Sequence, residues 1–185
     1  MSQAQTPEDA AAFLRSLDKE QLVQLAMDDA KNWLAHDGLW FQAVESAHGM
    51  QAAIAADAAA WERFTAIEAR RIMERRGIAS GGGIPALLEC LRHRMYARLN
   101  TQEVTEATAT RAVFVMRECR VQAARKRKGL SDFPCKSVGI VEYAGFAKAI
   151  DPRIETRCLA CPPDAHPEDA WCAWEFTMTG APGGG

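Results

Sequence analysis

The segment from Cys119 to Cys172 holds the side chains best suited to chemistry. It contains five of the six cysteines of the chain, and Cys158 and Cys161 form a C-x-x-C pair. Two intervening residues let both thiolates turn toward a single metal ion. Thiolates at this density suit zinc or an iron–sulfur cluster better than magnesium or calcium. We therefore expect a cysteine-bound metal, with zinc first and an iron–sulfur cluster as the alternative.

Four cysteines form the predicted ligand set, and a fifth is held in reserve. The four are Cys135, Cys158, Cys161 and Cys172, and the reserve is Cys119. Two other roles stay open for these thiols: a redox pair, and packing as small apolar side chains. Cys90 stands among leucines in a helical pattern, so it is predicted to lie in the core.

A second group of candidate residues comes from the stretch His36–Phe41, which is predicted to be a corner between two helices. An imidazole and a carboxylate there could face a pocket as general base and orienting group. The alternative is that Asp37 caps the second helix while His36 ends the first. The ligand-pocket candidates are His36, Asp37, Trp40 and Tyr143, and no catalytic residue is assigned.

The elements that must position these residues differ between the two halves of the chain. Apolar residues recur at helical spacing through residues 18–99, whereas β-branched and aromatic residues become frequent later. This predicts an α+β fold, in which an N-terminal helical half packs on a small, mostly antiparallel sheet with additional helices. Residues 18–179 are predicted to form a single domain, made of the helical half 18–99 and a cysteine-rich half 100–179. Residues 1–17 and 180–185 are predicted to be flexible.

Within the second half, the pattern predicts strands at 111–117, 154–159 and 172–178. Helices are expected at 121–128 and 138–150, the second of them ended by Asp151-Pro152.

The overall composition excludes several classes of partner. The 185 residues carry 22 basic and 24 acidic side chains, so no strong charge attracts nucleic acid or anionic membrane. No apolar run reaches the length of a membrane span, and no targeting segment is visible. We expect a cytoplasmic protein with a small-molecule ligand, and the sequence leaves a homo-oligomer open.

Several motifs together resemble an uncharacterised bacterial and archaeal family of cytosolic proteins. That family is similar to the L-2-amino-thiazoline-4-carboxylic acid hydrolase-like proteins. More distantly, the sequence resembles the vinyl-reductase-type domains that sense small aromatic compounds. The resemblance covers nearly the whole chain and rests on Asn32–Phe41, Cys119–Gln122, Phe133–Lys136, Ile150–Ile154 and Cys158–Pro163.

The resemblance to the sensor domains implies an α+β pocket with a cysteine-ligated zinc near its floor. Carried onto this sequence, it would make Cys135, Cys161 and Cys172 the ligands. Cys158 and Cys119 are cysteines beyond those three ligands, so an iron–sulfur cluster stays an alternative to zinc.

The sequence therefore predicts a small-molecule-binding domain with a cysteine-ligated metal. A thiazoline-type hydrolase is the alternative, with Cys135 or a metal-bound water as nucleophile. A non-catalytic interaction protein is a third reading, so whether the chain is an enzyme stays open.

Overall fold

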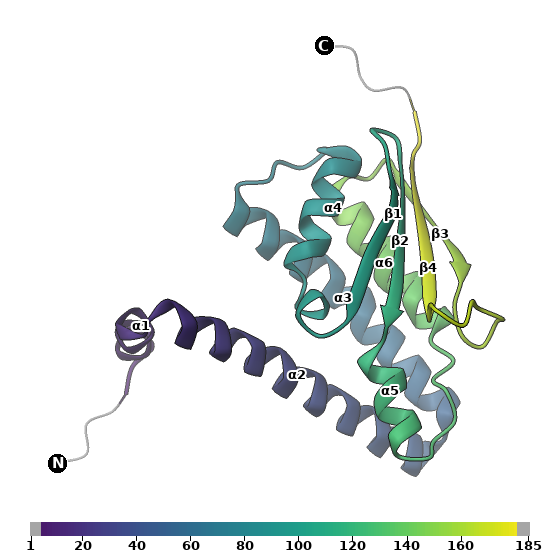
Figure 1. Ribbon diagram of the computed structural model, residues 1–185, viewed down its shortest axis with the longest axis horizontal. Coiled ribbons are helices and arrows are strands. Elements are labelled where there is room, and N and C mark those ends of the chain that lie inside the picture. The colour runs from purple at the N-terminus through teal and green to yellow at the C-terminus, as the bar shows by residue number, and fades with distance from the viewer. Residues whose placement is uncertain (1–4, 181–185) are drawn as a thin grey trace.

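The computed structural model describes residues 5–180 and has the predicted α+β fold (Figure 1). A long helical segment precedes a four-stranded antiparallel sheet, and two further helices lie between its strands in the sequence. The helices are α1 (Pro7–Ser16), α2 (Lys19–His48), α3 (Met50–Arg76), α4 (Gly83–His93), the short 3-10 helix η1 (Met95–Arg98), α5 (Arg120–Arg127) and α6 (Lys136–Ile150). The strands are β1 (Thr101–Ala107), β2 (Arg111–Glu118), β3 (Ile154–Ala160) and β4 (Cys172–Met178).

The sheet has the strand order β1-β2-β4-β3, which places β2 and β4 at its centre. Trp174 on β4 pairs with Phe114 on β2 and with Cys158 on β3. Successive side chains of a strand point to opposite faces, so these three residues share the face that packs on the helices. On the other face, Arg111 and Arg157 both pair with Glu175 at 2.8 Å.

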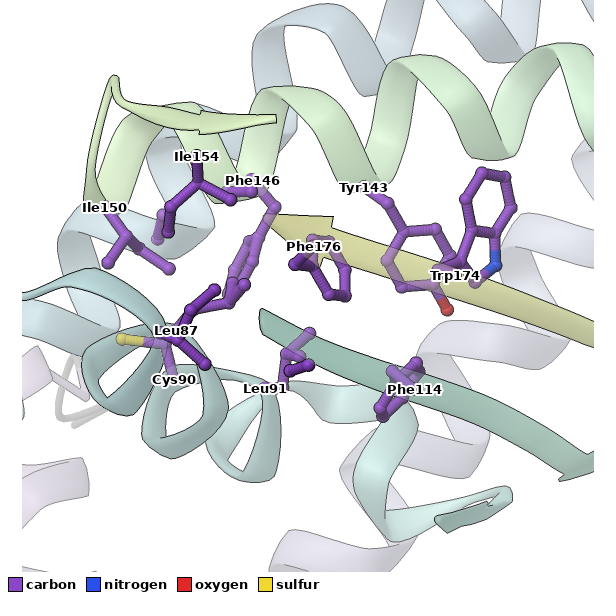
Figure 2. Close-up of a cluster of buried hydrophobic side chains, with 14 of the residues drawn as sticks. Leu87, Cys90, Leu91, Phe114, Tyr143, Phe146, Ile150, Ile154, Trp174 and Phe176 are labelled. Atoms are coloured by element: carbon purple, nitrogen blue, oxygen red, sulfur yellow. The ribbon is translucent and has the colours of Figure 1, made fainter. Parts of the chain in front are cut away.

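The main core lies between the sheet and helices α3, α4 and α6 (Figure 2). Phe146 and Ile150 on α6 meet Phe176 on β4 and Leu87 on α4, and all four are fully buried. Cys90 lies in the same cluster, as the sequence predicted. This core fixes α6 against the sheet, and α6 in turn carries several residues of the site described below.

Helix α2 runs without interruption through the predicted corner, so that part of the prediction was wrong. Gly38 lies inside the helix, where glycine costs only about 1 kcal/mol relative to alanine. Asp37 therefore caps no second helix. The helix is capped at its start by Asp18, which accepts a hydrogen bond from the Gln21 amide, and it ends at Gly49, whose φ is +84°.

The N-terminal segment is more ordered than expected, since Pro7–Ser16 form α1 with a capping box between Thr6 and Asp9. Residues 1–4 and 181–185 of the predicted flexible ends lie outside the described residues. Helix α1 and the first half of α2 extend away from the sheet (Figure 1), and Phe13 and Val23 are largely exposed there.

Most elements of the second half are confirmed, with small shifts at their ends. Strands β2, β3 and β4 and helices α5 and α6 lie where the pattern predicts them. The edge strand β1 was not predicted as a strand, because its residues are mostly exposed and polar. In the predicted helical half, α4 ends at His93 and the short helix η1 follows it.

Among the helices described within residues 5–180, none combines the length and the apolar character that a membrane span requires.

Candidate ligand-binding site

A cavity of about 440 Å³ lies where helices α2, α3, α5 and α6 meet one end of the sheet. Its volume falls in the range of small-molecule sites, which is roughly 300–1,000 Å³. The surface of its walls is mainly apolar, although eight charged side chains take part in the lining. The cavity therefore has the size and character of a binding site for a compact organic molecule.

Aromatic rings from four parts of the chain form much of the wall. Trp61 on α3 stacks with Tyr96 on η1, with ring centroids 5.9 Å apart. Tyr143 on α6 stacks with Trp174 on β4 at 4.7 Å, and Figure 2 shows these two rings side by side. Phe133, in the loop before α6, adds a fifth ring. Since flat rings offer large apolar faces, these walls favour an aromatic or apolar ligand.

Three carboxylates also line the cavity, one from each of three helices: Asp37 on α2, Asp57 on α3 and Glu142 on α6. Burial raises the pKa of all three carboxyl groups. The pKa of Asp57 rises to about 7, since Asp37 and Glu142 add like charge to its burial, and a hydrogen bond with Trp61 opposes the rise. These three carboxyl groups are therefore poorly solvated. Five basic side chains line the cavity as well: Lys31, Arg120, Arg125, Arg127 and Lys128.

One buried cation compensates part of this charge. Arg94, only 2% exposed, places Nη1 2.7 Å from Glu142 Oε1 and Nε 2.9 Å from Glu68 Oε2. Its guanidinium lies 5.6 Å from the ring centre of Trp61 and 4.6 Å from that of Phe146. Contacts of this kind between a cation and ring faces are attractive. Arg94 thereby links α3, α6 and η1 behind the wall of the cavity.

Four thiols meet at the end of the cavity nearest the sheet: those of Cys119, Cys135, Cys161 and Cys172. The Sγ atoms of Cys135 and Cys161 are 3.5 Å apart. Hydrogen bonding with the Cys161 thiol lowers the pKa of Cys135, and the pKa of Cys161 is raised through its bonds to Cys135 and Cys172. Burial raises the pKa of Cys119 to about 12. The Trp174 indole N–H donates to Cys172 Sγ at 3.3 Å.

The loop that carries Cys135 is held by a buried glutamine. Gln122 on α5 donates to the Phe133 carbonyl at 2.8 Å and accepts from the Phe133 amide at 2.9 Å. Its amide nitrogen also lies 3.7 Å from Cys135 Sγ. Arg125 binds both oxygens of Glu45, at 2.7 and 2.9 Å, and so ties α5 to α2. These bonds fix the side of the cavity that α5 forms.

The thiols fit a metal only in part. A zinc–sulfur distance of about 2.3 Å in a tetrahedral site separates two sulfur atoms by about 3.8 Å, close to the separation of Cys135 and Cys161. Cys172 lies within hydrogen-bonding reach of Cys161, whereas Cys158 is not part of the cavity wall. Within residues 5–180, no three His, Cys, Asp or Glu side chains are arranged to hold a metal.

The structure brings only some of the predicted pocket residues to the cavity. Asp37 and Tyr143 line it, but His36 and Trp40 do not. Because α2 is continuous, the helical rotation turns these two away from the cavity, and Trp40 is 66% exposed. Trp61 belongs to the wall as well.

Sequence reasoning did not assign Asp57, Glu142, Gln122 or Arg94 to the site. Two of them carry a usable signal. Glu142 is the one acidic residue of the otherwise apolar helix α6, and a charge in such a helix points to a buried partner or a site. Asp57 precedes Trp61 by one helical turn, which places both on one face. Arg94 and Gln122 stand in polar stretches, where nothing distinguishes them.

The fold and its cavity define an α+β domain built around an internal pocket. The chain belongs to a family of unknown function, DUF6125, which matches residues 15–178. A solved structure of the phenol-responsive sensory domain of the transcription activator PoxR, with phenol, has a similar fold, with a TM-score of 0.53 and 14% identity over 76% of this chain and 72% of that one. No curated protein matches the chain. Neither match names a thiazoline hydrolase.

Proposed function

We propose that this protein is a small-molecule-binding domain whose cavity holds a compact ligand with an aromatic or apolar body. The observation that carries the proposal is the cavity itself, about 440 Å³, with a mainly apolar surface formed in part by the rings of Trp61, Tyr96, Tyr143 and Trp174. Such a combination is typical of ligand sites.

The similar fold of the PoxR sensory domain, whose structure contains phenol, supports this proposal. At 14% identity the likeness concerns the fold, so the ligand of this chain must be argued from its own cavity. The hydrolase and interaction-protein alternatives rest on the sequence alone, and no contact in the cavity favours them.

The proposal is tested by narrowing the cavity while keeping the fold. A Cβ at Gly38 would meet nothing closer than the Gln42 amide nitrogen at 4.0 Å, so larger side chains fit there without a clash at Cβ. Gly38 also lines the cavity. We expect phenol, benzyl alcohol or benzylamine to raise the melting temperature of the wild type and of Gly38→Ala. Gly38→Leu should remain folded and lose most of that increase.

An equal increase in Gly38→Leu and the wild type would place the binding elsewhere and contradict the proposal. So would a wild type whose melting temperature responds to none of the three compounds at millimolar concentration.

We also propose that the thiols beside the cavity hold a zinc ion. The separation of Cys135 and Cys161, and the position of Cys172 beside Cys161, support this assignment. Bound zinc would tie the loop before α6 to the end of β3 and the start of β4, and so stabilise the floor of the cavity. An iron–sulfur cluster is the alternative, and elemental analysis separates the two.

A further inference from the structure

We propose that the cavity selects a protonated amine attached to an aromatic or apolar body. This inference rests on the proposed binding function and names the chemical class of its ligand. The geometry that carries it is the pairing of two uncompensated carboxylates, Asp37 and Asp57, with the ring faces of Trp61 and Tyr96 in one cavity.

The basic and acidic side chains around the cavity are not all paired with one another. Arg94 and Arg125 are buried cations of this region and both are already paired: Arg94 with Glu142 and Glu68, and Arg125, which lines the cavity, with Glu45. Within residues 5–180, no Lys, Arg or His nitrogen lies within 4.0 Å of a carboxylate oxygen of Asp37 or Asp57. These two carboxylates come from facing helices, α2 and α3, and both line the same cavity.

Five basic side chains also line the cavity, and each of them is already paired with another group or exposed to solvent. Lys31 pairs with Asp28 at 2.8 Å, and Lys128 donates to Gln42 at 2.8 Å. Arg120 and Arg127 are exposed to solvent. Salt and water screen such exposed charges strongly, whereas partly buried charges are screened much less. We therefore expect the unpaired carboxylates Asp37 and Asp57 to decide which ligand charge is favoured.

A cationic ligand would supply the missing countercharge. Burying an ionised carboxylate without a partner is costly, and the raised pKa of Asp57, about 7, reports that cost. An ammonium group between Asp37 and Asp57 would remove it. The rings would add cation–π attraction, which the protein already uses for its own guanidinium: Arg94 lies 5.6 Å from the ring centre of Trp61 and 5.7 Å from that of Tyr96. A carboxylate ligand would meet like charge instead.

The test compares three compounds of nearly equal shape: benzylamine, benzyl alcohol and benzoate. We expect calorimetric titration near neutral pH to show that benzylamine binds at least about tenfold more tightly than benzyl alcohol, and benzoate most weakly, where tenfold equals about 1.4 kcal/mol. Asp57→Asn should weaken benzylamine binding about tenfold and leave benzyl alcohol within about twofold. The matched control is Asp164→Asn, which changes an exposed carboxylate outside the cavity and should alter neither affinity.

The pH dependence gives a second measurement on the same proteins. Asp57 is faced by Asp37, Glu142 and Trp61, Arg94 offsets Glu142, and His36 adjoins Asp37. Because Asp57 ionises near pH 7, benzylamine should bind more tightly as pH rises from about 6 to 8, while benzyl alcohol should not change. Asp57→Asn should remove most of that rise.

Equal or tighter binding of benzyl alcohol or benzoate would overturn the inference and leave the binding function standing. An equal loss of both amine and alcohol in Asp57→Asn would also overturn it, since the residue would then act on structure alone. If none of the three compounds binds the wild type and phenol does not bind it either, the proposed function itself fails.

Discussion

Arg94 Nη1 lies 2.7 Å from Glu142 Oε1, and this ion pair stands directly behind the cavity wall. Neither side chain is more than 12% exposed. The pair joins the segment before η1 to α6, while the second contact of Arg94, with Glu68, reaches α3. A guanidinium buried this deeply is tolerated only when it is paired with carboxylates. The cavity wall and the stability of the fold therefore depend on the same Arg94 side chain.

Replacing Arg94 by methionine should destabilise the protein strongly. The substitution leaves Glu68 and Glu142 buried without a cation, which typically costs about 3–5 kcal/mol. Arg92→Met is the matched control, because the Arg92 side chain is 80% exposed and should change stability by less than about 0.5 kcal/mol. Urea unfolding of both variants measures the difference. A cost below about 1 kcal/mol for Arg94→Met would show that the ion pair contributes little.

Two glycines inside helices should respond to alanine in opposite directions. A Cβ at Gly139 on α6 would lie 2.7 and 2.9 Å from atoms of the buried Trp174 ring, so Gly139→Ala should cost about 1–3 kcal/mol. The Cβ of Gly38→Ala would meet only the Gln42 amide nitrogen at 4.0 Å, without a clash, so this variant should gain about 0.5–1 kcal/mol from helix propensity. Thermal unfolding distinguishes the two. A neutral Gly139→Ala would mean that α6 does not approach β4 this closely.

Stability should fall as Asp57 ionises. Its pKa in the folded protein is about 7, against 3.8 for the free side chain, so the folded state binds the proton more tightly. The protonated Asp57 therefore makes its full contribution to the free energy of unfolding below about pH 4, and this contribution is lost as pH rises toward 7. A difference of about 3 in pKa corresponds to at most about 4 kcal/mol.

Asp57→Asn lacks this titration, so its stability relative to the wild type should increase between about pH 4 and 7. Urea unfolding of both proteins at several pH values measures that difference. Parallel profiles would contradict the assignment of the raised pKa to Asp57.

Zinc should accompany the folded protein if the thiols bind it. Elemental analysis of anaerobically purified protein should find about one zinc per chain, and Cys161→Ser should lose it. Cys90→Ser is the control, since Cys90 lies in the core away from the cavity and should keep the metal. A visible absorbance with iron in place of zinc would favour the cluster. Wild-type protein that is fully folded without any metal would refute both assignments.

The sequence predicts the α+β fold and most of its elements because local patterns decide them. The alternation of apolar and polar residues in β4 is consistent only with a strand, and the apolar run of α6 only with a buried helix. The course of α2 could not be predicted in the same way. Gly38 and Asp37 read locally as a helix end, but the packing of Phe41 and Trp33 against the rest of the structure stabilises a continuous helix.

The site was harder to predict than the fold, since its residues come from elements far apart in the chain. Of the predicted ligand set, Cys135, Cys161 and Cys172 line one cavity together with the reserve residue Cys119, whereas Cys158 does not. That these thiols bind a metal stays a prediction. Asp57 and Glu142 come close to Asp37 only because three helices pack together. No local sequence pattern could have predicted that these three carboxylates lie near one another. The cytoplasmic location and a homo-oligomer stay predictions from the sequence.

The most direct test of the binding site uses the tryptophans as position markers. In a ¹⁵N spectrum of the indole N–H groups, saturation with benzylamine or benzyl alcohol should shift the signals of Trp61 and Trp174, which line the cavity. The signal of Trp40, which is 66% exposed outside the cavity, should stay in place. Spectra in which neither compound moves the Trp61 and Trp174 signals, or in which the Trp40 signal alone moves, would contradict a ligand site in this cavity.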